Sequence, residues 1–280
     1  MLLDARPIRE KKLEELKKRV EKLEKKPGLV IIRVGNDPAS EKYVNNKVKM
    51  CEHVGINSKV LHYKEDVTNI ELFQCIKKLN SDESVTGILI QLPLPKHLDE
   101  DYLLNIIDPK KEVDGFCVEN MGRLVRGEKA PVACTPKGII TLLKEYNIPI
   151  EGKDVLIINR SNIVGKPLAH LFLEENATVT VAHSKTKNLL QKVWNADIVV
   201  TAIGKPKFFR STHFRINTTI IDVSINFDEN GKMCGDVDKE GYEFLNYRDC
   251  NITPVPNGVG IMTVLSLIEQ TIEMEENKQK

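Results

Sequence analysis

The sequence predicts an α/β protein built of two α/β domains, the second a Rossmann-like parallel sheet. Short apolar runs alternate with helical segments between residues 29 and 91, and again between residues 154 and 223. Pro149 and Gly152 interrupt the chain between these two stretches. An order of strand, helix and strand is typical of parallel sheets with crossover helices, whose ligands lie beyond the carboxyl ends of the strands.

The composition is that of a globular protein with ample core, since 41% of its 280 residues are hydrophobic and 29% are charged. Basic and acidic residues number 41 and 40 and nearly cancel, so the charge balance does not indicate a nucleic-acid partner. The six cysteines have neither metal-ligand spacing nor a disulfide pattern, as is usual for reduced thiols in a cytosol. An early charged N-terminus and the lack of a long apolar run predict no signal peptide and no membrane span. We therefore expect a cytoplasmic protein without a metal site.

The first half of the chain is predicted to contain three strands and their connecting helices. A charged helix over residues 9–26 has leucine or valine at heptad spacing and ends at Pro27-Gly28. Two heptads are too few for a coiled coil, so we expect this helix to pack on its own domain. Strands are predicted at 29–34, 58–63 and 86–91, and helices at 38–53, 70–79 and 97–107.

The helix after the first strand carries the first candidate for chemistry. Asp37 is placed to cap it and Pro38 to occupy its first position. Tyr43 and Lys47 are four residues apart and therefore share one face. A lysine held out of water gives up its proton more readily, so Lys47 would be a proton-transfer group near neutral pH. The alternative is a solvated lysine on an amphipathic helix.

Two further polar residues follow in the first half. Gln91 emerges from a strand into a loop stiffened by prolines, where it can accept from an ammonium or bind a substrate amide. Asp114 precedes a Gly-Phe turn, where its carboxylate can accept two N–H donors from a heterocycle. The alternatives are a surface glutamine before a turn and an Asx-type turn.

The second half begins with a helix at 137–146, capped by Cys134-Thr135, and a strand at 154–158. The loop from Asn159 to Pro167 then opens a helix at 165–175, where a dinucleotide fold binds pyrophosphate. Only Gly165 of the expected glycines is present, so the motif by itself is weak. Later strands are predicted at 177–182, 197–201 and 218–223.

The residues after the strand at 177–182 predict the cofactor. An NAD site usually has an acidic residue there, whereas this chain has His183-Ser184 and two lysines. Together with Arg160, these residues favour the 2′-phosphate of NADP. Gly204 and Ser224 follow later strands and would let a flat cofactor approach the backbone; ordinary turns are the alternative.

Two loops near the C-terminus are less informative. The residue types of the loop at 235–238 do not indicate a function for it. The loop at 253–258 leads into a last helix at 259–273 and would present free N–H groups to an anion or a substrate carbonyl. A tight return between domains is the alternative.

Taken together, the motifs resemble the bifunctional methylenetetrahydrofolate dehydrogenase/methenyltetrahydrofolate cyclohydrolase family along nearly the whole chain. Eight blocks match in order: Pro38-Ala39-Ser40 with Tyr43-Val44 and Lys47; Gln91 to Pro95; Val113 to Phe116; Cys134 to Pro136; Arg160-Ser161 with Ile163 to Gly165 and Pro167; His183-Ser184; Gly235 to Val237; and Thr253 to Pro256.

This resemblance implies a cleft between a folate-binding catalytic domain, residues 1–135 completed by the C-terminal helix 256–280, and an NADP-binding domain, residues 136–255. The implied catalytic residues are Lys47, Tyr43, Gln91 and Asp114. All four also bind the tetrahydrofolate substrate, and the further implied substrate contacts are Val44, Ile90, Leu92, Pro256, Gly258, Val259 and Gly260. The implied cofactor contacts are Asn159, Arg160, Ser161, Gly165, His183, Ser184, Gly204 and Ile225. The family is typically homodimeric.

Four residues depart from the family pattern. Asn159 and Ser224 stand where the family has glycine, Asn257 stands in place of the first of two glycines, and Ile261 replaces a proline. Asparagine tolerates left-handed backbone better than most residues, so we expect the fold to be retained at Asn159 and Asn257.

The activity implied is that of an oxidoreductase and hydrolase of one-carbon metabolism. Methylenetetrahydrofolate is oxidised with NADP to a methenyl cation, which is hydrolysed to 10-formyltetrahydrofolate. Three alternatives are a dehydrogenase without cyclohydrolase activity, a cofactor-binding scaffold without turnover, and an unrelated NADP oxidoreductase acting on a shikimate-like hydroxy acid. The intact set of Tyr43, Lys47 and Gln91 argues against the first alternative, and the same set with the cofactor loops argues against the second. The blocks around Asp114 and from Gln91 to Pro95 argue against the third.

Overall fold

The computed structural model describes residues 1–279, which form two compact units. The first unit is Lys11–Cys134 with the chain from Val264 onward, and the second is Met1–Glu10 with Thr135–Thr263. The sequence instead predicted that residues 1–10 belong with the first domain and 256–263 with the C-terminal helix of that domain. The N-terminus joins the second unit because Leu2 pairs with Ile252 and the Leu3 N–H donates to the Ile252 carbonyl at 2.8 Å.

The first unit contains three parallel strands and their helices. Its elements are α2 (Pro38–Val54), α3 (Asn69–Ser81), α4 (Glu100–Asn105) and α5 (Val118–Val125), with β1 (Gly28–Val34), β2 (Asn57–Tyr63) and β3 (Gly87–Ile90). Helix α1 (Ala5–Glu21) begins and ends about five residues before the predicted 9–26. Its part from Lys11 onward belongs to this unit and buries Leu13, Leu16 and Val20.

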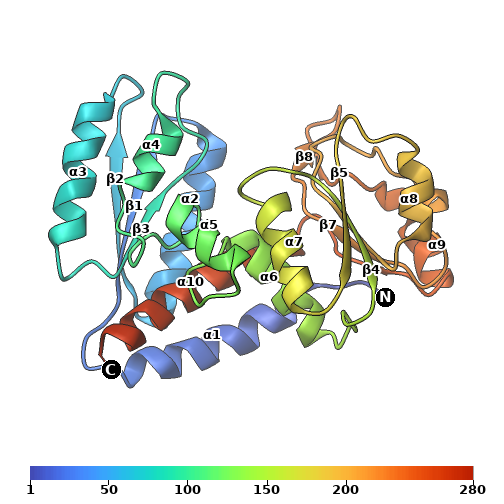
Figure 1. The fold of residues 1–280 in the computed structure, drawn as a ribbon, viewed down its shortest axis with the longest axis horizontal. Coiled ribbons are helices and arrows are strands. Elements are labelled where there is room, and N and C mark those ends of the chain that lie inside the picture. Colours follow the sequence, from blue (N-terminus) through green and yellow to red (C-terminus); the bar gives the residue numbers. More distant parts are fainter. Residues whose placement is uncertain (280) are drawn as a thin grey trace. The chain divides into compact units, whose positions relative to one another are not determined.

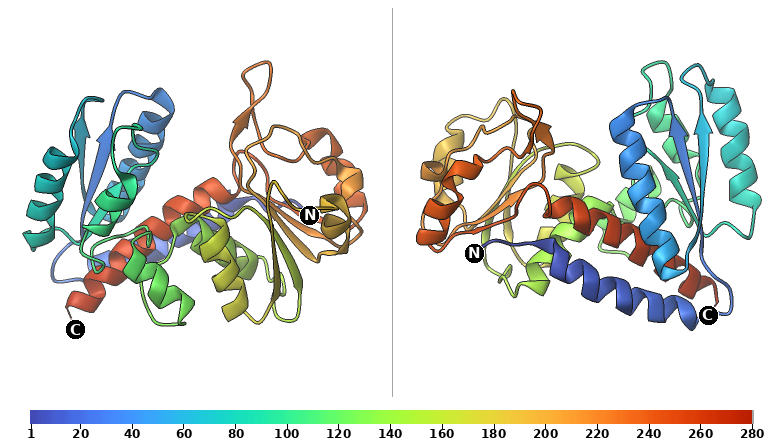
Figure 2. Two further views of the ribbon diagram at one scale, coloured as in Figure 1. Left: turned by 45° about the horizontal axis from the view of Figure 1, so that its top comes forward. Right: turned by 180° about the vertical axis from the view of Figure 1, so that it is seen from behind.

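The strand order of the first sheet is β2-β1-β3. Helices α2 and α3 lie on opposite faces of this sheet (Figure 2). Residues 111–113 continue the sheet, because the Ile88 N–H donates to the Lys111 carbonyl and the Val113 N–H to the Ile88 carbonyl. The strand order reverses direction between β1 and β3, and the carboxyl ends of these two strands therefore flank the place where such sheets bind ligands.

The second unit contains a five-stranded sheet. Its elements are α6 (Cys134–Glu145), α7 (Gly165–Glu174), α8 (Leu189–Asn195), α9 (Tyr242–Tyr247), β4 (Asp154–Ile158), β5 (Thr178–Ala182), β6 (Ile198–Thr201), β7 (Thr219–Asp222), β10 (Asn251–Ile252), the hairpin of β8 (Asn226–Phe227) and β9 (Met233–Cys234), and the 3₁₀ turns Ser211–His213 and Lys239–Gly241. Helix α10 (Val259–Lys278) begins in the second unit and ends in the first.

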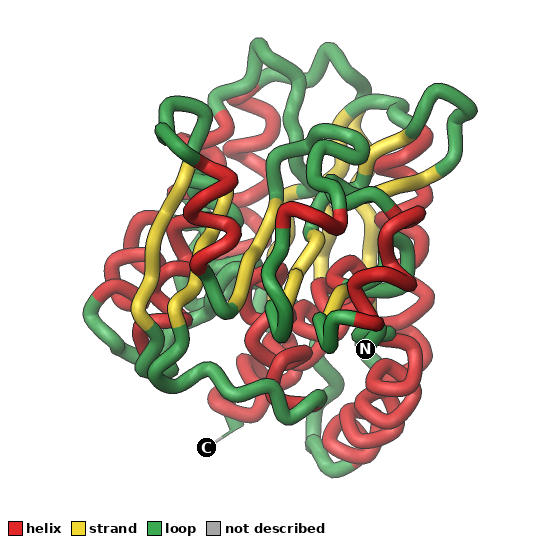
Figure 3. The backbone as a smooth tube through the Cα atoms, turned by 90° about the vertical axis from the view of Figure 1, so that its right-hand side faces the viewer, coloured by secondary structure: helices red, strands yellow, loops and turns green. Residues whose placement is uncertain are grey.

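The five strands are parallel and lie in the order β10-β7-β6-β4-β5. Helices α6 and α7 cover one face, and α8 and α9 cover the other (Figure 1), where they pack on a core that includes Leu156, Val193 and Leu245. The alternation of helix and strand can be followed in Figure 3. This arrangement confirms the predicted α/β class with a Rossmann-like sheet, and its order reverses between β4 and β6.

The ends of α2 follow the sequence signals. Asp37 caps the helix by accepting the Ser40 N–H at 2.7 Å, Pro38 is its first residue, and Gly55 ends it in the left-handed region. The predicted cap of α6 is wrong, because Cys134 and Thr135 lie within the helix rather than before it. Helices α5, α8 and α9 and the β8–β9 hairpin were not predicted, since each is short. Within residues 1–279, no helix combines the length and apolarity needed to span a membrane.

Candidate functional site in two switch-point loops

Lys47 lies in the first unit with its side chain only 5% exposed. Its Nζ donates to Gln91 Oε1 at 3.0 Å and stands 4.8 Å from the centre of the Tyr43 ring. The Gln91 Nε2 donates to the Leu92 carbonyl at 2.8 Å, which fixes the amide with its oxygen toward the lysine. The structure therefore brings together Tyr43, Lys47 and Gln91, as the sequence predicted, with a cation–π contact between the first two.

This group spans the point where the strand order reverses. Helix α2 follows β1, and Gln91 directly follows β3. A helical side chain tilts toward the helix N-terminus, so Lys47 reaches from α2 toward the carboxyl ends of the strands. The hydrogen bond between Lys47 and Gln91 thus joins the segments that follow β1 and β3.

Asp114 emerges at the same edge of the sheet. Glu112 bridges Ile88 of β3 in parallel register, so Asp114 leaves the sheet beside the end of that strand. Asp114 is partly exposed, and its N–H donates to Glu112 Oε1 at 3.0 Å. Its carboxylate is placed beyond the carboxyl end of the sheet, where a ligand would lie.

Glu112 is a residue that the sequence did not single out. It is 1% exposed and also accepts the N–H groups of Phe116 at 2.6 Å and Cys117 at 3.3 Å. Burial, with the charge of Asp114 as a second cause, raises the pKa of Glu112 to about 7. Glu112 therefore shapes the backbone turn that presents Asp114. An acid two residues before Asp114 was its only sequence signal.

Three predicted substrate contacts are less open. Val44 and Ile90 are 1% and 3% exposed, so they are core residues of α2 and β3. Leu92 is half-buried against the core of the first unit.

Cys51, one turn beyond Lys47, is fully buried; burial raises the pKa of its thiol to about 12, so it stays protonated.

In the second unit, the loop after β4 is held by the side chain of Asn159. Its Oδ1 accepts the Ser161 N–H at 2.8 Å, the Ser161 hydroxyl at 2.7 Å and the Gly165 N–H at 3.1 Å. A Cβ on Gly165 would lie 2.1 Å from the Asn159 carbonyl oxygen. Glycine is therefore required where α7 begins, as in loops that bring a backbone close to a pyrophosphate.

Arg160 and Ser184 occupy matching positions on neighbouring strands. Ile158 pairs with Ala182 in the parallel register of β4 and β5, and each of the two residues lies two positions beyond that pair. Both are exposed. His183 begins a turn, with its N–H donating to Thr186 Oγ1 at 2.9 Å. No acidic residue occurs between His183 and Lys187.

Of the remaining predicted residues of the second unit, four lie in loops, namely Gly204, Ile225, Pro256 and Gly258, and Val259 and Gly260 begin α10. Gly204 follows β6 with φ +67°, and its N–H donates to Ser224 Oγ at 3.1 Å. Ile225 is 54% exposed. Among residues before α10, Pro256 is exposed, whereas a Cβ on Gly258 would lie 2.5 Å from the Pro254 oxygen. A Cβ on Gly260 would lie 4.0 Å from Ile225 Cδ1, so Ile225 is close to the start of α10. Val259, the first residue of that helix, is buried.

The four departures from the family pattern have local explanations. Asn257 adopts a left-handed φ of 80°, as expected for a residue replacing glycine. Asn159 does not have a positive φ. It is tolerated because its side chain bonds the loop. The Ser224 hydroxyl links two loops. The Ile261 N–H donates to the Gly258 carbonyl at 3.1 Å, a bond that proline could not make.

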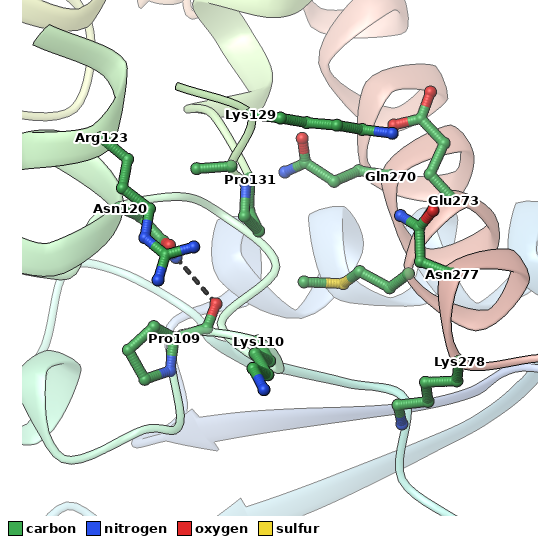
Figure 4. A pocket seen from close by; sticks show the side chains of 12 residues that line it. Pro109, Lys110, Asn120, Arg123, Lys129, Pro131, Gln270, Glu273, Asn277 and Lys278 are labelled. Carbon is green, nitrogen blue, oxygen red and sulfur yellow. Dashed lines mark hydrogen bonds between the residues drawn. The ribbon is translucent and has the colours of Figure 1, made fainter. Parts of the chain in front are cut away.

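A separate pocket of about 500 Å³ lies in the first unit between α5, residues 129–131 and α10 (Figure 4). Lys110, Arg123, Lys129 and Lys278 line it, and Asn120 donates to the Pro109 carbonyl on one wall. Its lining includes none of the predicted site residues. This pocket is therefore distinct from the site around Lys47.

Comparisons with known proteins match nearly the full length. Residues 3–114 match the tetrahydrofolate dehydrogenase/cyclohydrolase catalytic domain, and residues 133–279 match the NAD(P)-binding domain of the same family. The chain is 49% identical over 275 residues to the bifunctional protein FolD of Agathobacter rectalis, covering 97% of this chain and 98% of that protein.

Solved structures agree with this match. The FolD methylenetetrahydrofolate dehydrogenase/cyclohydrolase of Campylobacter jejuni has a TM-score of 0.95 at 43% identity and 99% coverage of both chains. The Trypanosoma brucei dehydrogenase-cyclohydrolase, solved with NADP and an inhibitor, has a TM-score of 0.93 at 32% identity, covering 100% of this chain and 98% of that one. Since sequence and fold agree along both units, this chain belongs to the tetrahydrofolate dehydrogenase/cyclohydrolase family.

Proposed function

We propose that this protein oxidises methylenetetrahydrofolate to methenyltetrahydrofolate with NADP and then hydrolyses the product to 10-formyltetrahydrofolate. Membership of the family over both domains supports the two activities. The observation that carries the hydrolytic half is the buried Lys47 bonded to a neutral amide, Gln91. A dehydrogenase without cyclohydrolase activity, or a scaffold without turnover, has no need of that pair.

The loops of the second unit fit NADP as the cofactor. Gly165 allows a close backbone approach at the start of α7, and Arg160 and Ser184 lie at matching positions beyond β4 and β5. Arg160 and Ser184 would hold the 2′-phosphate, with Ser161, His183, Gly204 and Ile225 as further contacts. The bound cofactor supplies the acceptor for the hydride that leaves the one-carbon bridge of the folate.

In the hydrolytic step, Lys47 moves protons. Water attacks the methenyl carbon, and Lys47 takes a proton from that water. Lys47 then returns that proton to the ring nitrogen while the carbon–nitrogen bond breaks, and the second proton of the attacking water is released to solvent as the formyl C=O forms. Gln91 and Tyr43 orient the Lys47 amine. Asp114 accepts hydrogen bonds from the N–H groups of the pteridine and so fixes the position of the methenyl carbon.

The proposal is tested by absorbance assays with methylenetetrahydrofolate and either NADP or NAD. We expect methenyl formation to be faster with NADP, followed by conversion to the formyl product without added catalyst. Methenyl that accumulates at the uncatalysed rate of decay would exclude the cyclohydrolase half. A preference for NAD would exclude the assignment of NADP.

We also propose that the protein is a homodimer in solution, as the family resemblance implies. Strand β5 is an edge of its sheet and exposes Val181 at 41%. An exposed edge of this kind can be covered by a second copy. Light scattering during size-exclusion chromatography would give the mass; a single-chain mass at working concentration contradicts the dimer.

A further inference from the structure

The loop at 235–238 matches the family pattern but has no assigned role, and the structure shows what its acid contacts. Asp236 is 0% exposed, and its carboxylate accepts five hydrogen bonds. The donors are Thr201 Oγ1 at 2.8 Å, Ile203 N at 2.9 Å, Lys205 N at 2.9 Å, Ser224 Oγ at 2.8 Å and Asn226 Nδ2 at 3.0 Å. All of these donor groups are uncharged, so they hold the carboxylate by their dipoles rather than by an ion pair.

These donors come from two of the predicted cofactor loops. Three of them lie at the end of β6 or just after it, around Gly204. Two lie after β7, on either side of Ile225. The Ser224 hydroxyl donates to Asp236 and accepts the Gly204 N–H, so it binds both loops to the same carboxylate.

A third loop is attached to the first two. Asn159 Nδ2 donates to the Ala202 carbonyl at 2.7 Å. This bond crosses the switch point between β4 and β6. The Oδ1 atom of Asn159 also accepts the N–H groups of Ser161 and Gly165. The loops after β4, β6 and β7 are therefore one connected hydrogen-bonded network.

The rest of the motif places Asp236. A Cβ on Gly235 would lie 2.0 Å from Asp222 Oδ2, so only glycine fits before the aspartate. Asp222, 1% exposed, accepts the N–H groups of Asp236 at 3.1 Å and Val237 at 2.8 Å. Val237 is fully buried in the core of the second unit. Each of the three residues has a separate steric or polar reason to be there.

We infer that Asp236 is a positioning residue for the cofactor, fixing the loops that carry Gly204 and Ile225 without touching the cofactor itself. This inference rests on the proposed function, because it assigns these loops to cofactor binding. A preorganised site binds more tightly because less conformational freedom is lost on binding. Loosening the loops should weaken cofactor binding and leave the chemistry at Lys47, in the other unit, unchanged.

The test is Asp236→Asn with Asp238→Asn as the matched control. The amide nitrogen that the first substitution introduces cannot accept a hydrogen bond, so at least some of the five donors lose their acceptor. Asp238 lies in the same loop, and asparagine preserves its role as the cap of residues 239–241. We expect Asp236→Asn to raise the NADP Michaelis constant and the NADPH dissociation constant by roughly 10-fold or more, with cyclohydrolase rates close to those of the parent and the control unchanged.

Thr201→Val is the second variant, because it removes one donor and keeps the shape of a fully buried side chain. It should raise the same two constants by about 3-fold or more even if Asp236→Asn fails to fold. Unchanged NADPH affinity in a folded Asp236→Asn or in Thr201→Val overturns the inference. An equal loss of cyclohydrolase activity also overturns it, since that indicates a general structural role. A parent protein that neither binds nor reduces NADP would instead refute the proposed function.

Discussion

At the scale of single residues, the position of a polar side chain decides its chemistry. Lys47 and Lys49 lie two residues apart on α2, yet Lys47 is buried against Gln91 and Tyr43 whereas Lys49 is exposed. Under the proposed function, this buried amine, bonded to an amide, is the group that exchanges a proton with the substrate. Asp114 and Glu112 differ in the same way, one open to a ligand and the other used inside its own turn.

Lys47→Met should separate the two activities. Hydride transfer requires no base, whereas hydration moves protons, and general acid–base catalysis contributes roughly 10²–10⁴-fold. We expect cyclohydrolase activity to fall by about that factor while part of the dehydrogenase activity remains, so that the methenyl intermediate accumulates. Lys49→Met is the control. A folded Lys47→Met variant that hydrolyses methenyltetrahydrofolate at the parent rate would show that another group moves the proton. Gln91→Ala should cause a smaller bias in the same direction.

Asp114→Ala should weaken folate binding in both reactions. Hydrogen bonds to a charged group contribute about 1.5–3 kcal/mol each, so the folate Michaelis constant should rise on the order of 10-fold or more. NADP affinity should stay near that of the parent, because the cofactor loops lie in the other unit. Asp101→Ala, an exposed acid on α4, controls for loss of charge. Normal folate affinity would remove Asp114 from the substrate site.

At the scale of elements, each of the two sheets has a strand-order reversal that is spanned by a side-chain hydrogen bond. Each reverses its strand order beside its first strand, between β1 and β3 and between β4 and β6. In each, a side-chain hydrogen bond spans that reversal: Lys47 to Gln91 in the first, Asn159 to Ala202 in the second. The switch point leaves an opening beyond the strands, and these bonds fix the loops on its two sides.

The pairing of β4 with β5 gives a prediction about cofactor choice. Because Arg160 and Ser184 follow the same register pair, they should meet one phosphate group together. Arg160→Ala should raise the Michaelis constant for NADP by roughly 10-fold or more and that for NAD far less. Lys192→Ala, an exposed cation on α8, is the control. Equal effects on both cofactors would count against a 2′-phosphate role.

At the scale of the whole molecule, each unit contains a buried acid whose pKa is raised by burial. Burial is the main cause that raises the pKa of Glu112 in the first unit and of Asp222 in the second to about 7. Such a group binds its proton more tightly in the folded chain than in the unfolded chain. Its contribution to stability is therefore complete below its ordinary pKa and falls as the pH rises toward the folded value.

The free energy of unfolding should thus decrease between pH 4.5 and about 7 because of Glu112. The decrease from this one residue should be at most about 3 kcal/mol. Denaturant unfolding of the parent and of Glu112→Gln at several pH values isolates the effect, since glutamine does not titrate. The stability of the variant relative to the parent should rise with pH. A difference that stays constant across that pH range contradicts the assignment.

Local signals in the sequence predicted most of the fold. Asp37, Pro38 and Gly55 bound α2 as expected, because capping and turn preferences act over a few residues. Short elements such as α9 were missed because six residues contain too little periodicity to detect. The contact-based unit that holds the first ten residues differs from the predicted domain, because pairing with Ile252 depends on a contact about 250 residues away.

The sequence by itself determined the α/β class, the family and the group of Tyr43, Lys47 and Gln91. These depend on hydrophobic periodicity and on motifs whose residues are close in the chain or fall at strand ends. Only the tertiary structure decided what Asp236, Glu112 and Asn159 do. Whether a carboxylate or an amide is solvated, or buried among backbone donors, depends on burial and on partners from distant segments, and neither can be read from neighbouring residues.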